Sequence, residues 1–230
     1  MSREINFFAP NEYYHIYNRG TEKRKIFTTE ADYLRFISLL YLCNTPESLH
    51  RSDYSQASLD QLLSLKRGKT LVAIGAYCLM PNHFHILMHE HTESGISTFM
   101  QKLITAYTMY FNRKYDRSGA LFQGRFKAER VKQDNHLKYL FAYINLNPVS
   151  IVDNEWKKHI LKNKKTAINY LKSYRYSSYL DYLNPKSRTP EGKIIDKMVF
   201  PEYFRKSRDF HDYIKDIMDW AHATHVKVQP

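Results

Sequence analysis

The sequence has few cysteines and no long apolar segment, and each shortage excludes a class of protein. Cys43 and Cys78 are the two cysteines among 230 residues, too few for a framework of disulfides and suited to a reducing compartment. No apolar run approaches the roughly 20 residues that a membrane-spanning helix needs. Residues 1–10 also lack the apolar centre of a signal peptide, so we expect a cytoplasmic protein.

The sequence also lacks the glycine-rich loop that binds nucleotide phosphates, so we expect a reaction that needs no external energy source. It contains no internal repeat and no low-complexity tract. Hydrophobic residues make up 43% of the chain, which is enough for a sizeable core, and the length suits one domain with an extension. We predict a main domain over residues 1–150 and a basic, mostly helical extension over residues 151–230.

The charge is strongly positive and the chain is rich in aromatic residues. The formal net charge is +12 at pH 7, the sequence pI is about 9.5, and there are 19 tyrosines. This balance favours a polyanionic partner, with nucleic acid first, because aromatic rings stack on unpaired bases. A lysine-rich surface that only contacts solvent is the alternative interpretation.

Apolar residues that alternate predict strands, and apolar residues at helical spacing predict helices. The predicted strands cover residues 12–19, 70–80, 83–89 and 120–131. The predicted helices cover residues 29–43, 97–115 and 135–147. Thr29 and Asp32 form a predicted capping box at the start of the first helix, and Ser97 is the predicted cap of the second. The third helix is predicted to begin at Asp134 or Asn135 and to end before Pro148. The polar composition of residues 44–69 predicts a surface insertion with a short helix at 59–65. The spacing of apolar residues over 186–230 predicts one or two amphipathic helices.

The order of these elements, strand, helix, strand, strand, helix, strand, is that of a split βαβ unit. We therefore predict an α+β fold with a ferredoxin-like, RRM-like core, in which two helices cover one face of an antiparallel sheet. The added helix at 135–147 follows the last core strand, and we expect it to cross the other face of the sheet.

A His-Phe-His sequence opens the strand at 83–89. Side chains alternate along a strand, so His83 and His85 point to one face while Phe84 and Ile86 point to the core. Two imidazoles on one face can bind a single cation, although an exposed pair without a ligand is equally compatible with the pattern. His89 shares the face, but it lies too far along the strand to join the same cation.

The helix at 135–147 carries a second pair of polar groups. Tyr143 and Asn147 are four residues apart and lie on one side of the helix, at the border of its apolar stripe. An amide oxygen can bind a cation and a phenol can attack an electrophile. Spacing alone does not favour Tyr143 over Tyr139, and packing is the ordinary role of such a tyrosine.

Four blocks of sequence, in order, resemble one family. They are residues 14–20 (YHIYNRG), 76–88 (AYCLMPNHFHILM), 118–127 (SGALFQGRFK) and 143–149 (YINLNPV). The chain resembles the REP-associated tyrosine transposases, a branch of the single-tyrosine HUH transposases of small bacterial insertion sequences. It departs from them after Asn-Pro-Val, where Ser150-Ile151-Val152 stands in place of the basic residue that members often carry.

The resemblance implies a metal-dependent nuclease and strand transferase that acts on single-stranded DNA with hairpin or palindromic elements. It implies that Tyr143 is the nucleophile, which forms a covalent 5′-phosphotyrosine. It further implies that His83, His85 and Asn147 bind a divalent metal, Mg²⁺ or Mn²⁺, and it leaves a homodimer open. Imidazole ligands alone would suit zinc equally well.

Basic residues near the ends of the predicted elements are the candidates for contacts with DNA phosphates. The candidates are Arg19, Arg24, Arg113, Lys114, Arg117, Arg125, Lys127 and Arg130. Tyr17, Tyr110 and Phe122 are candidates for stacking on bases.

Two other functions remain open from the sequence. A zinc-dependent hydrolase would use His83, His85 and a third His or Asp, and it would work without Tyr143. A domesticated descendant of a transposase would bind DNA hairpins without chemistry, and it would form no covalent adduct.

Overall fold

A four-stranded antiparallel sheet forms the centre of the computed structural model, which describes residues 8–47, 51–54, 56–158, 161–184 and 190–224. The strands are β1 (Tyr13–Arg19), β2 (Val72–Met80), β3 (His83–Glu90) and β4 (Lys127–Val131), in the order β2-β3-β1-β4. Every neighbouring pair is antiparallel. Helix α1 (Glu30–Leu42) connects β1 to β2, and α3 (Gly95–Lys114) connects β3 to β4. This confirms the predicted split βαβ core.

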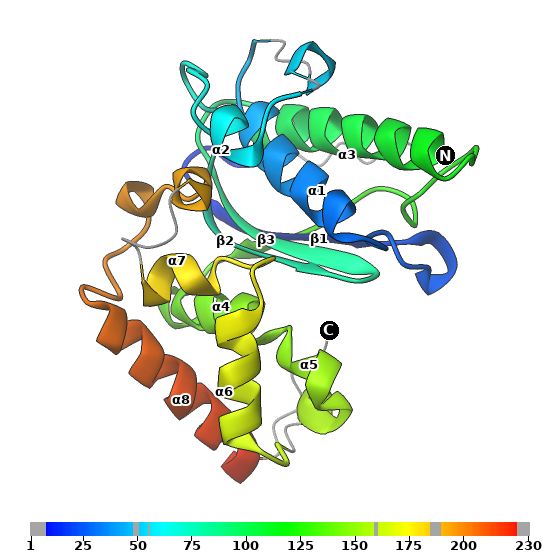
Figure 1. Ribbon diagram of the computed structural model, residues 1–230. Helices are drawn as coiled ribbons and strands as arrows, with labels where there is room; N and C mark the ends of the chain where they lie inside the picture. The colour runs from blue at the N-terminus through cyan, green and yellow to red at the C-terminus, as the bar shows by residue number, and fades with distance from the viewer. Residues whose placement is uncertain (1–7, 48–50, 55, 159–160, 185–189, 225–230) are drawn as a thin grey trace, which may run out of the picture.

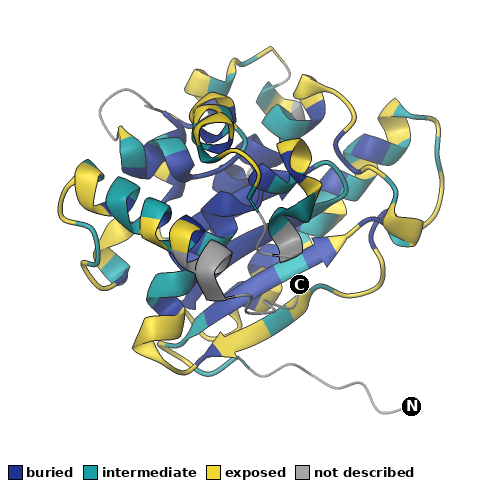
Figure 2. Cartoon of the chain, turned by 90° about the horizontal axis from the view of Figure 1, so that it is seen from below, coloured by how far each residue is buried: buried dark blue, intermediate teal, exposed yellow. Residues whose placement is uncertain are grey.

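Helices cover both faces of the sheet (Figure 1). Helices α1 and α3 lie on one face, and α4 (Asp134–Leu146) crosses the other, as predicted. Helices α6 (Lys164–Ser173), α7 (Tyr179–Leu183) and α8 (Ser207–Thr224) form a further layer beyond α4. The buried residues gather where the sheet meets the helices (Figure 2). The shorter helices are η1 (Thr21–Lys23), η2 (Arg51–Tyr54), α2 (Leu59–Leu62), α5 (Val149–Val152), η3 (Asn154–Lys158), η4 (Glu191–Ile194) and η5 (Lys197–Val199).

The register of the strands sets which side chains face α4. Tyr17 pairs with His85, and Arg19 pairs with His83. Residues directly opposite each other in a sheet point to the same face. The face toward α4 therefore carries both histidines together with the odd-numbered residues of β1. The even-numbered residues Ile16, Phe84 and Ile86 are fully buried on the other face, against α1 and α3.

The turn between β2 and β3 is held by backbone hydrogen bonds to the segment that follows β1. The carbonyl of Pro81 accepts hydrogen bonds from the amides of Ile26 (2.8 Å) and Phe27 (3.1 Å), and the amide of Gly20 donates to the carbonyl of Asn82 (2.8 Å). A Cβ atom at Gly20 would lie 2.4 Å from the carbonyl oxygen of Arg24, so this close approach of backbone requires glycine. The start of β3 is thereby fixed in place.

The segment after α6 attaches α4 to the edge of the sheet. The amide of Leu79 donates to the carbonyl of Tyr176, and the amide of Ser178 donates to the carbonyl of Tyr77, both at 2.9 Å. The hydroxyl of Ser178 donates to the side-chain oxygen of Asn145 on α4 (2.9 Å). Helix α4 is therefore held between the sheet on one side and the C-terminal helices on the other.

Three predicted boundaries are wrong, and contacts from another element explain the first of them. Helix α3 begins at Gly95, not at Ser97, because the buried carboxylate of Glu90 accepts hydrogen bonds from the amides of Gly95 (3.0 Å) and Ile96 (2.9 Å). The strand predicted at 120–131 is reduced to β4, because Gly119 and Gly124 adopt positive φ angles and turn the chain. Helix α4 takes Gln133, not Asp134 or Asn135, as its N-cap residue.

The predicted surface insertion is partly a core element. The short helix α2 is present within the predicted range, but Leu62 and Leu63 are buried against α1. Asn44, at the start of the insertion, is also buried and accepts hydrogen bonds from the amides of Leu71 and Val72 at 3.0 Å. Because most of the segment is polar, its composition did not indicate that these few residues are buried. Residues 48–50 and 55 of the insertion, and 159–160, 185–189 and 225–230 of the extension, lie outside the described residues.

Asp32 joins the start of α1 to the end of α3. Its buried carboxylate accepts hydrogen bonds from the amides of Thr28 and Thr29 and from the hydroxyl of Tyr115, and it forms an ion pair with Lys114 at 2.6 Å. Burial raises the pKa of Asp32, but these hydrogen bonds outweigh burial and lower it from 3.8 to about 2. The Asp32 side chain of the predicted capping box thus also holds α1 against α3.

We expect Asp32→Asn to lower the free energy of unfolding at pH 7 by about 2.5 kcal/mol, because one pKa unit corresponds to about 1.4 kcal/mol. Since the folded-state pKa is below the unfolded value, the contribution is present above pH 4 and is lost as the pH falls toward 2. Denaturant titrations at several pH values measure both effects. Glu22→Gln, at an exposed ion pair with Arg24, is the control and should cost less than about 1 kcal/mol. An unchanged stability of Asp32→Asn would contradict the anchoring role.

Candidate active site

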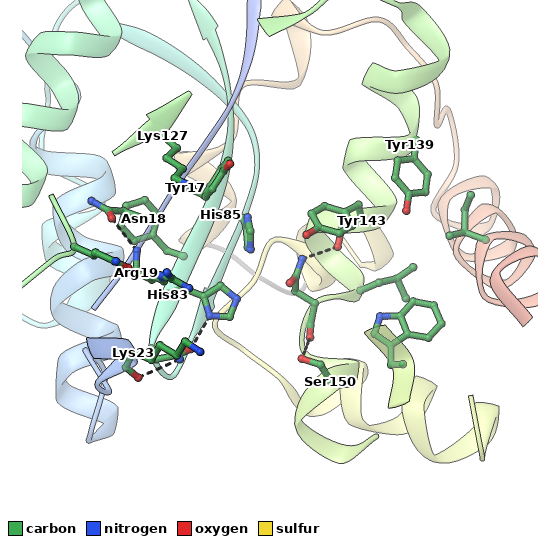
Figure 3. Close-up of a pocket in the computed structure, with 17 residues that line it drawn as sticks. Tyr17, Asn18, Arg19, Lys23, His83, His85, Lys127, Tyr139, Tyr143 and Ser150 are labelled. Atoms are coloured by element: carbon green, nitrogen blue, oxygen red, sulfur yellow. Dashed lines mark hydrogen bonds between the residues drawn. The ribbon is translucent and has the colours of Figure 1, made fainter. Parts of the chain in front are cut away.

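A cavity of about 650 Å³ lies between the sheet and α4. Figure 3 shows that its two walls come from different elements. One wall is formed by the ends of β1 and β4 and by the β2–β3 turn with the start of β3. The other wall is formed by α4 and the elements that follow it. The lining residues include His83, His85, Tyr143 and Asn147, and His15 lies just behind them.

His83 and His85 enter the cavity from β3, as the strand alternation predicts. Their rings are 5.1 Å apart and nearly perpendicular. The Nδ1 atom of His83 lies 2.7 Å from the side-chain oxygen of Asn82. Because that oxygen only accepts hydrogen bonds, Nδ1 of His83 carries the proton, and Nε2 is the nitrogen with the lone pair that a cation requires.

His15 on β1 is a neighbour of the site that the sequence analysis missed. Its Nε2 atom lies 2.9 Å from Nδ1 of His85, and the two rings are stacked with centroids 5.1 Å apart. Burial lowers the pKa of His15 from 6.5 to about 4, so at neutral pH the ring is uncharged. Alternation along β1 places His15 on the same face of the sheet as His85, and the register of β1 and β3 brings the two rings together.

Tyr143 approaches the histidines from α4 across the cavity (Figure 3). The edge of its ring faces His85, with centroids 5.7 Å apart, and His15, with centroids 5.9 Å apart. Burial raises the pKa of Tyr143 above 10, and the side chain of Asn147 opposes that shift. At neutral pH the phenol is therefore protonated and must lose its proton before it can attack.

Asn147 follows α4 and turns its side chain back along the helix. The amide nitrogen donates a hydrogen bond to the carbonyl of Tyr143 at 2.9 Å. Since the partner is an acceptor, the nitrogen of the amide is fixed there, and the oxygen is the atom that a cation would bind. The carbonyl of Asn147 in turn accepts a hydrogen bond from the hydroxyl of Ser150 at 2.8 Å. Pro148 interrupts the helix as predicted, and α5 continues after it.

The donor set suits a divalent cation of intermediate hardness. It combines two imidazoles with an amide oxygen on the walls of one cavity, and each histidine has its Nδ1 atom held by a second residue, as is usual for metal ligands. Among the described residues, no three His, Cys, Asp or Glu side chains are grouped so that they could hold a metal ion. His15 contacts His85 directly and does not line the cavity itself.

The sequence also matches a known protein family. The model of a family described as "Transposase IS200 like" matches residues 9–147, which is more than half of the chain. The chain belongs to the IS200-like transposase family. This confirms the resemblance to transposases drawn from the sequence blocks. The matched part runs from just before β1 to the residue after α4, so it includes both histidines, Tyr143 and Asn147.

The solved structures that are similar to this chain include two at low sequence identity. A REP-associated tyrosine transposase bound to a REP hairpin is 14% identical, with a TM-score of 0.46 over 88% of this chain and 98% of that one. A proposed transposase from Deinococcus radiodurans R1 is 17% identical, with a TM-score of 0.31 over 61% of this chain and 93% of that one. No curated protein sequence matches the transposase. None of the described helices is long and apolar enough to cross a membrane.

Two of the eight basic residues that the sequence suggested for DNA contact line the cavity. Arg19 extends from the end of β1, where its Nε atom donates to the side chain of Gln123, and Lys127 lies at the start of β4. The sequence analysis missed Lys23, which also lines the cavity and comes from η1. These cations give the sheet side of the transposase cavity a positive charge.

The structure does not bring the other six to the cavity. Arg113, Lys114 and Arg117 lie at or just after the end of α3, and the ammonium of Lys114 is bound by Asp32. Arg24 is paired with Glu22, and Arg130 with Glu12. Arg125 lies in the irregular segment before β4 and is exposed. Of the candidate aromatic residues, Tyr17 lines the cavity, Phe122 is buried in the core, and the hydroxyl of Tyr110 donates to Asp32.

Proposed function

We propose that the transposase cleaves and rejoins single-stranded DNA near hairpins through a covalent 5′-phosphotyrosine at Tyr143, with a divalent metal ion. The observation that carries this proposal is the approach of Tyr143 on α4 to His85 on β3 within one cavity. Membership of the transposase family supports a DNA-processing reaction. The four sequence blocks favour the REP-associated branch of that family, and the division of the chain near residue 150 stays a prediction.

His83, His85 and Asn147 would hold the metal ion in this proposal. A bound Mg²⁺ or Mn²⁺ would polarise the scissile phosphate and stabilise the negative charge that develops on its oxygens. The hydrogen bond that His83 donates to Asn82 and the hydrogen bond between His85 and His15 fix the ring orientation of the two histidines. Arg19, Lys23 and Lys127 add positive charge beside them, which favours the binding of the phosphate backbone.

The phenol of Tyr143 is the attacking group. Its oxygen forms a bond to phosphorus while the bond from phosphorus to the 3′-oxygen of the preceding nucleotide breaks. The phenolic proton is lost, and the departing oxygen takes up a proton to become a 3′-hydroxyl. The phosphotyrosine ester keeps the energy of the broken bond, so the 3′-hydroxyl of another strand can displace Tyr143 and join new DNA. A tyrosine nucleophile thus allows strand transfer, which hydrolysis by water would forfeit.

A covalent-adduct assay tests the proposal. The full-length protein is incubated with labelled single-stranded oligonucleotides that carry the imperfect palindromes flanking its gene, with Mn²⁺ or with EDTA. We expect a labelled protein–DNA species that survives denaturing electrophoresis and forms only with the metal. Hairpin binding in native gels without any such species would instead support the domesticated DNA-binding protein.

His15 is proposed as a positioning residue for His85 and Tyr143. His15→Phe keeps an aromatic ring against Tyr143 but removes the nitrogen that lies 2.9 Å from His85. We expect Mn²⁺ to bind about 10- to 100-fold more weakly, measured by calorimetry on the DNA-free protein. Cleavage at saturating Mn²⁺ should fall much less.

The matched variant His15→Gln offers an amide oxygen as an acceptor at the same position. We expect it to recover part of the lost metal affinity. If His15→Phe and wild type bind Mn²⁺ equally while His83→Ala binds it poorly, the orienting role of His15 is wrong and the metal site stands.

A further inference from the structure

We propose that the part of the chain after residue 147 completes a nucleobase-binding compartment next to Tyr143. In this compartment, the unpaired base beside the scissile phosphate stacks on Trp156 and Tyr139, over Leu146 and Ile217. The proposal rests on the proposed function, because it assigns the remainder of the same cavity to the substrate. It also gives a role to residues that the family match does not cover.

The cavity has two chemically different halves. The sheet side carries the histidines and the cations described above. The helix side carries four mainly apolar side chains, Tyr139 and Leu146 of α4, Trp156 of η3 and Ile217 of α8. In Figure 3 Tyr139 lies beside Tyr143 on the helix side, between α4 and the ribbon of α8. A nucleotide has the same two halves, a charged phosphate and a flat apolar base.

Trp156 and Ile217 are held by structure of their own. The carboxylate of Asp153 accepts hydrogen bonds from the amides of Glu155 (3.1 Å) and Lys162 (2.7 Å), and its carbonyl accepts one from the amide of Trp156 (3.1 Å). This sets the start of the turn that carries Trp156.

Helix α8 is fixed by a stripe of buried residues next to Ile217. Phe210, Ile214 and Met218 are buried at helical spacing, and the ring of Phe210 lies 4.9 Å from that of Tyr182 on α7. Ile217 is only partly buried, although it neighbours Met218. A side chain of this size in a hollow wall presents apolar surface to whatever enters the cavity.

The position of the nucleophile defines which part of DNA reaches this wall. Tyr139 lies one turn before Tyr143, and the two rings are inclined by 29° with centroids 6.1 Å apart. If the phosphate lies between Tyr143 and the histidines, the adjoining nucleoside must extend toward Tyr139 or away along the sheet. Single-stranded DNA has bases free to stack, and aromatic side chains bind them without regard to sequence. The cavity volume also suits a ligand of nucleotide size.

The test compares DNA with and without a base at the nucleotides on either side of the cleavage position. We expect Trp156→Ala to reduce the rate of adduct formation on ordinary DNA by roughly 5- to 100-fold, as the loss of one stacked base predicts. On DNA with an abasic site in the compartment, wild type and Trp156→Ala should react at similar rates. Trp156→Phe should restore most of the rate on ordinary DNA.

Fluorescence gives a readout that does not depend on cleavage. Trp220 is the other tryptophan in the sequence, so Trp220→Phe leaves Trp156 as the only tryptophan, whose emission can be excited separately from that of the tyrosines. In the uncleaving Tyr143→Phe, Trp220→Phe protein, single-stranded DNA should quench this emission, and the abasic DNA should quench it much less.

The outcomes separate this inference from the proposed function. Suppose that wild type forms adducts and that Trp156→Ala is slower than wild type by the same factor on ordinary DNA and on DNA that is abasic at either position. Trp156 then has a structural role only, and the proposed compartment is wrong. If Trp156→Ala matches wild type on ordinary DNA, the compartment is also wrong. If wild type forms no adduct with any DNA, the proposed function fails, and base-dependent quenching would then still support the compartment.

Discussion

Tyr143→Phe is expected to abolish the covalent protein–DNA species and to reduce cleavage by at least about 10³-fold, the scale seen when a nucleophile is removed. The phenylalanine keeps the ring that packs against His15 and His85 and removes only the attacking oxygen. Binding of hairpin DNA, measured in native gels, should stay within a few-fold of wild type. Denaturing gels with labelled DNA measure the adduct and the cut product separately.

Tyr139→Phe is the matched control for this experiment. Tyr139 lies on the same helix, lines the same cavity and is one turn from Tyr143. Its hydroxyl has no part in the proposed step, so the adduct should form at a rate within a few-fold of wild type. An adduct that survives Tyr143→Phe and disappears in Tyr139→Phe would transfer the role of nucleophile to Tyr139. Cleavage without any adduct in Tyr143→Phe would favour the zinc-dependent hydrolase.

His85→Ala is expected to lower cleavage by about 10²-fold or more, with a matching loss of divalent-metal affinity. His85 lies at the centre of the site, between His83, His15 and Tyr143. His83→Ala should act in the same direction. Calorimetry with Mn²⁺ on the DNA-free proteins measures the affinity, and titration of Mn²⁺ in the adduct assay should show a higher requirement for metal in each variant.

His89→Ala is the control for the metal experiment. His89 is on the same strand and faces the same side as His85, but its ring packs against Tyr13, with centroids 4.9 Å apart. It does not line the cavity. Metal binding and cleavage should therefore stay close to wild type. Normal Mn²⁺ affinity and normal cleavage in His83→Ala and His85→Ala would refute the metal site and, with it, the proposed mechanism.

Each local pattern that predicted this site depends on a single strand or a single helix. Strand alternation placed His83 and His85 on one face, and helical spacing placed Tyr143 and Asn147 on one side of α4. The arrangement of α4 across the sheet followed from the order of the elements. The choice of Tyr143 over Tyr139 could not come from spacing, since both line the cavity, and it came from resemblance to a family.

The features that were missed depend on residues brought together by the whole fold. The contact of His15 with His85 requires the register of β1 and β3, in which Tyr17 pairs with His85. Likewise, the carboxylate of Glu90 sets the start of α3 from the end of a strand. Trp156 and Ile217 belong to segments with ordinary amphipathic composition, and only tertiary packing shows that they border a cavity.

The way α4 is held has a consequence for how many molecules one reaction needs. Hydrogen bonds join this helix to the hairpin through Ser178, and the last helices cover its outer side. In the proposed function, the phenol and the imidazoles would therefore belong to one polypeptide. We expect one molecule to supply the whole reaction centre, so that a pairing of two copies would serve to hold two DNA ends together and not to assemble the chemistry.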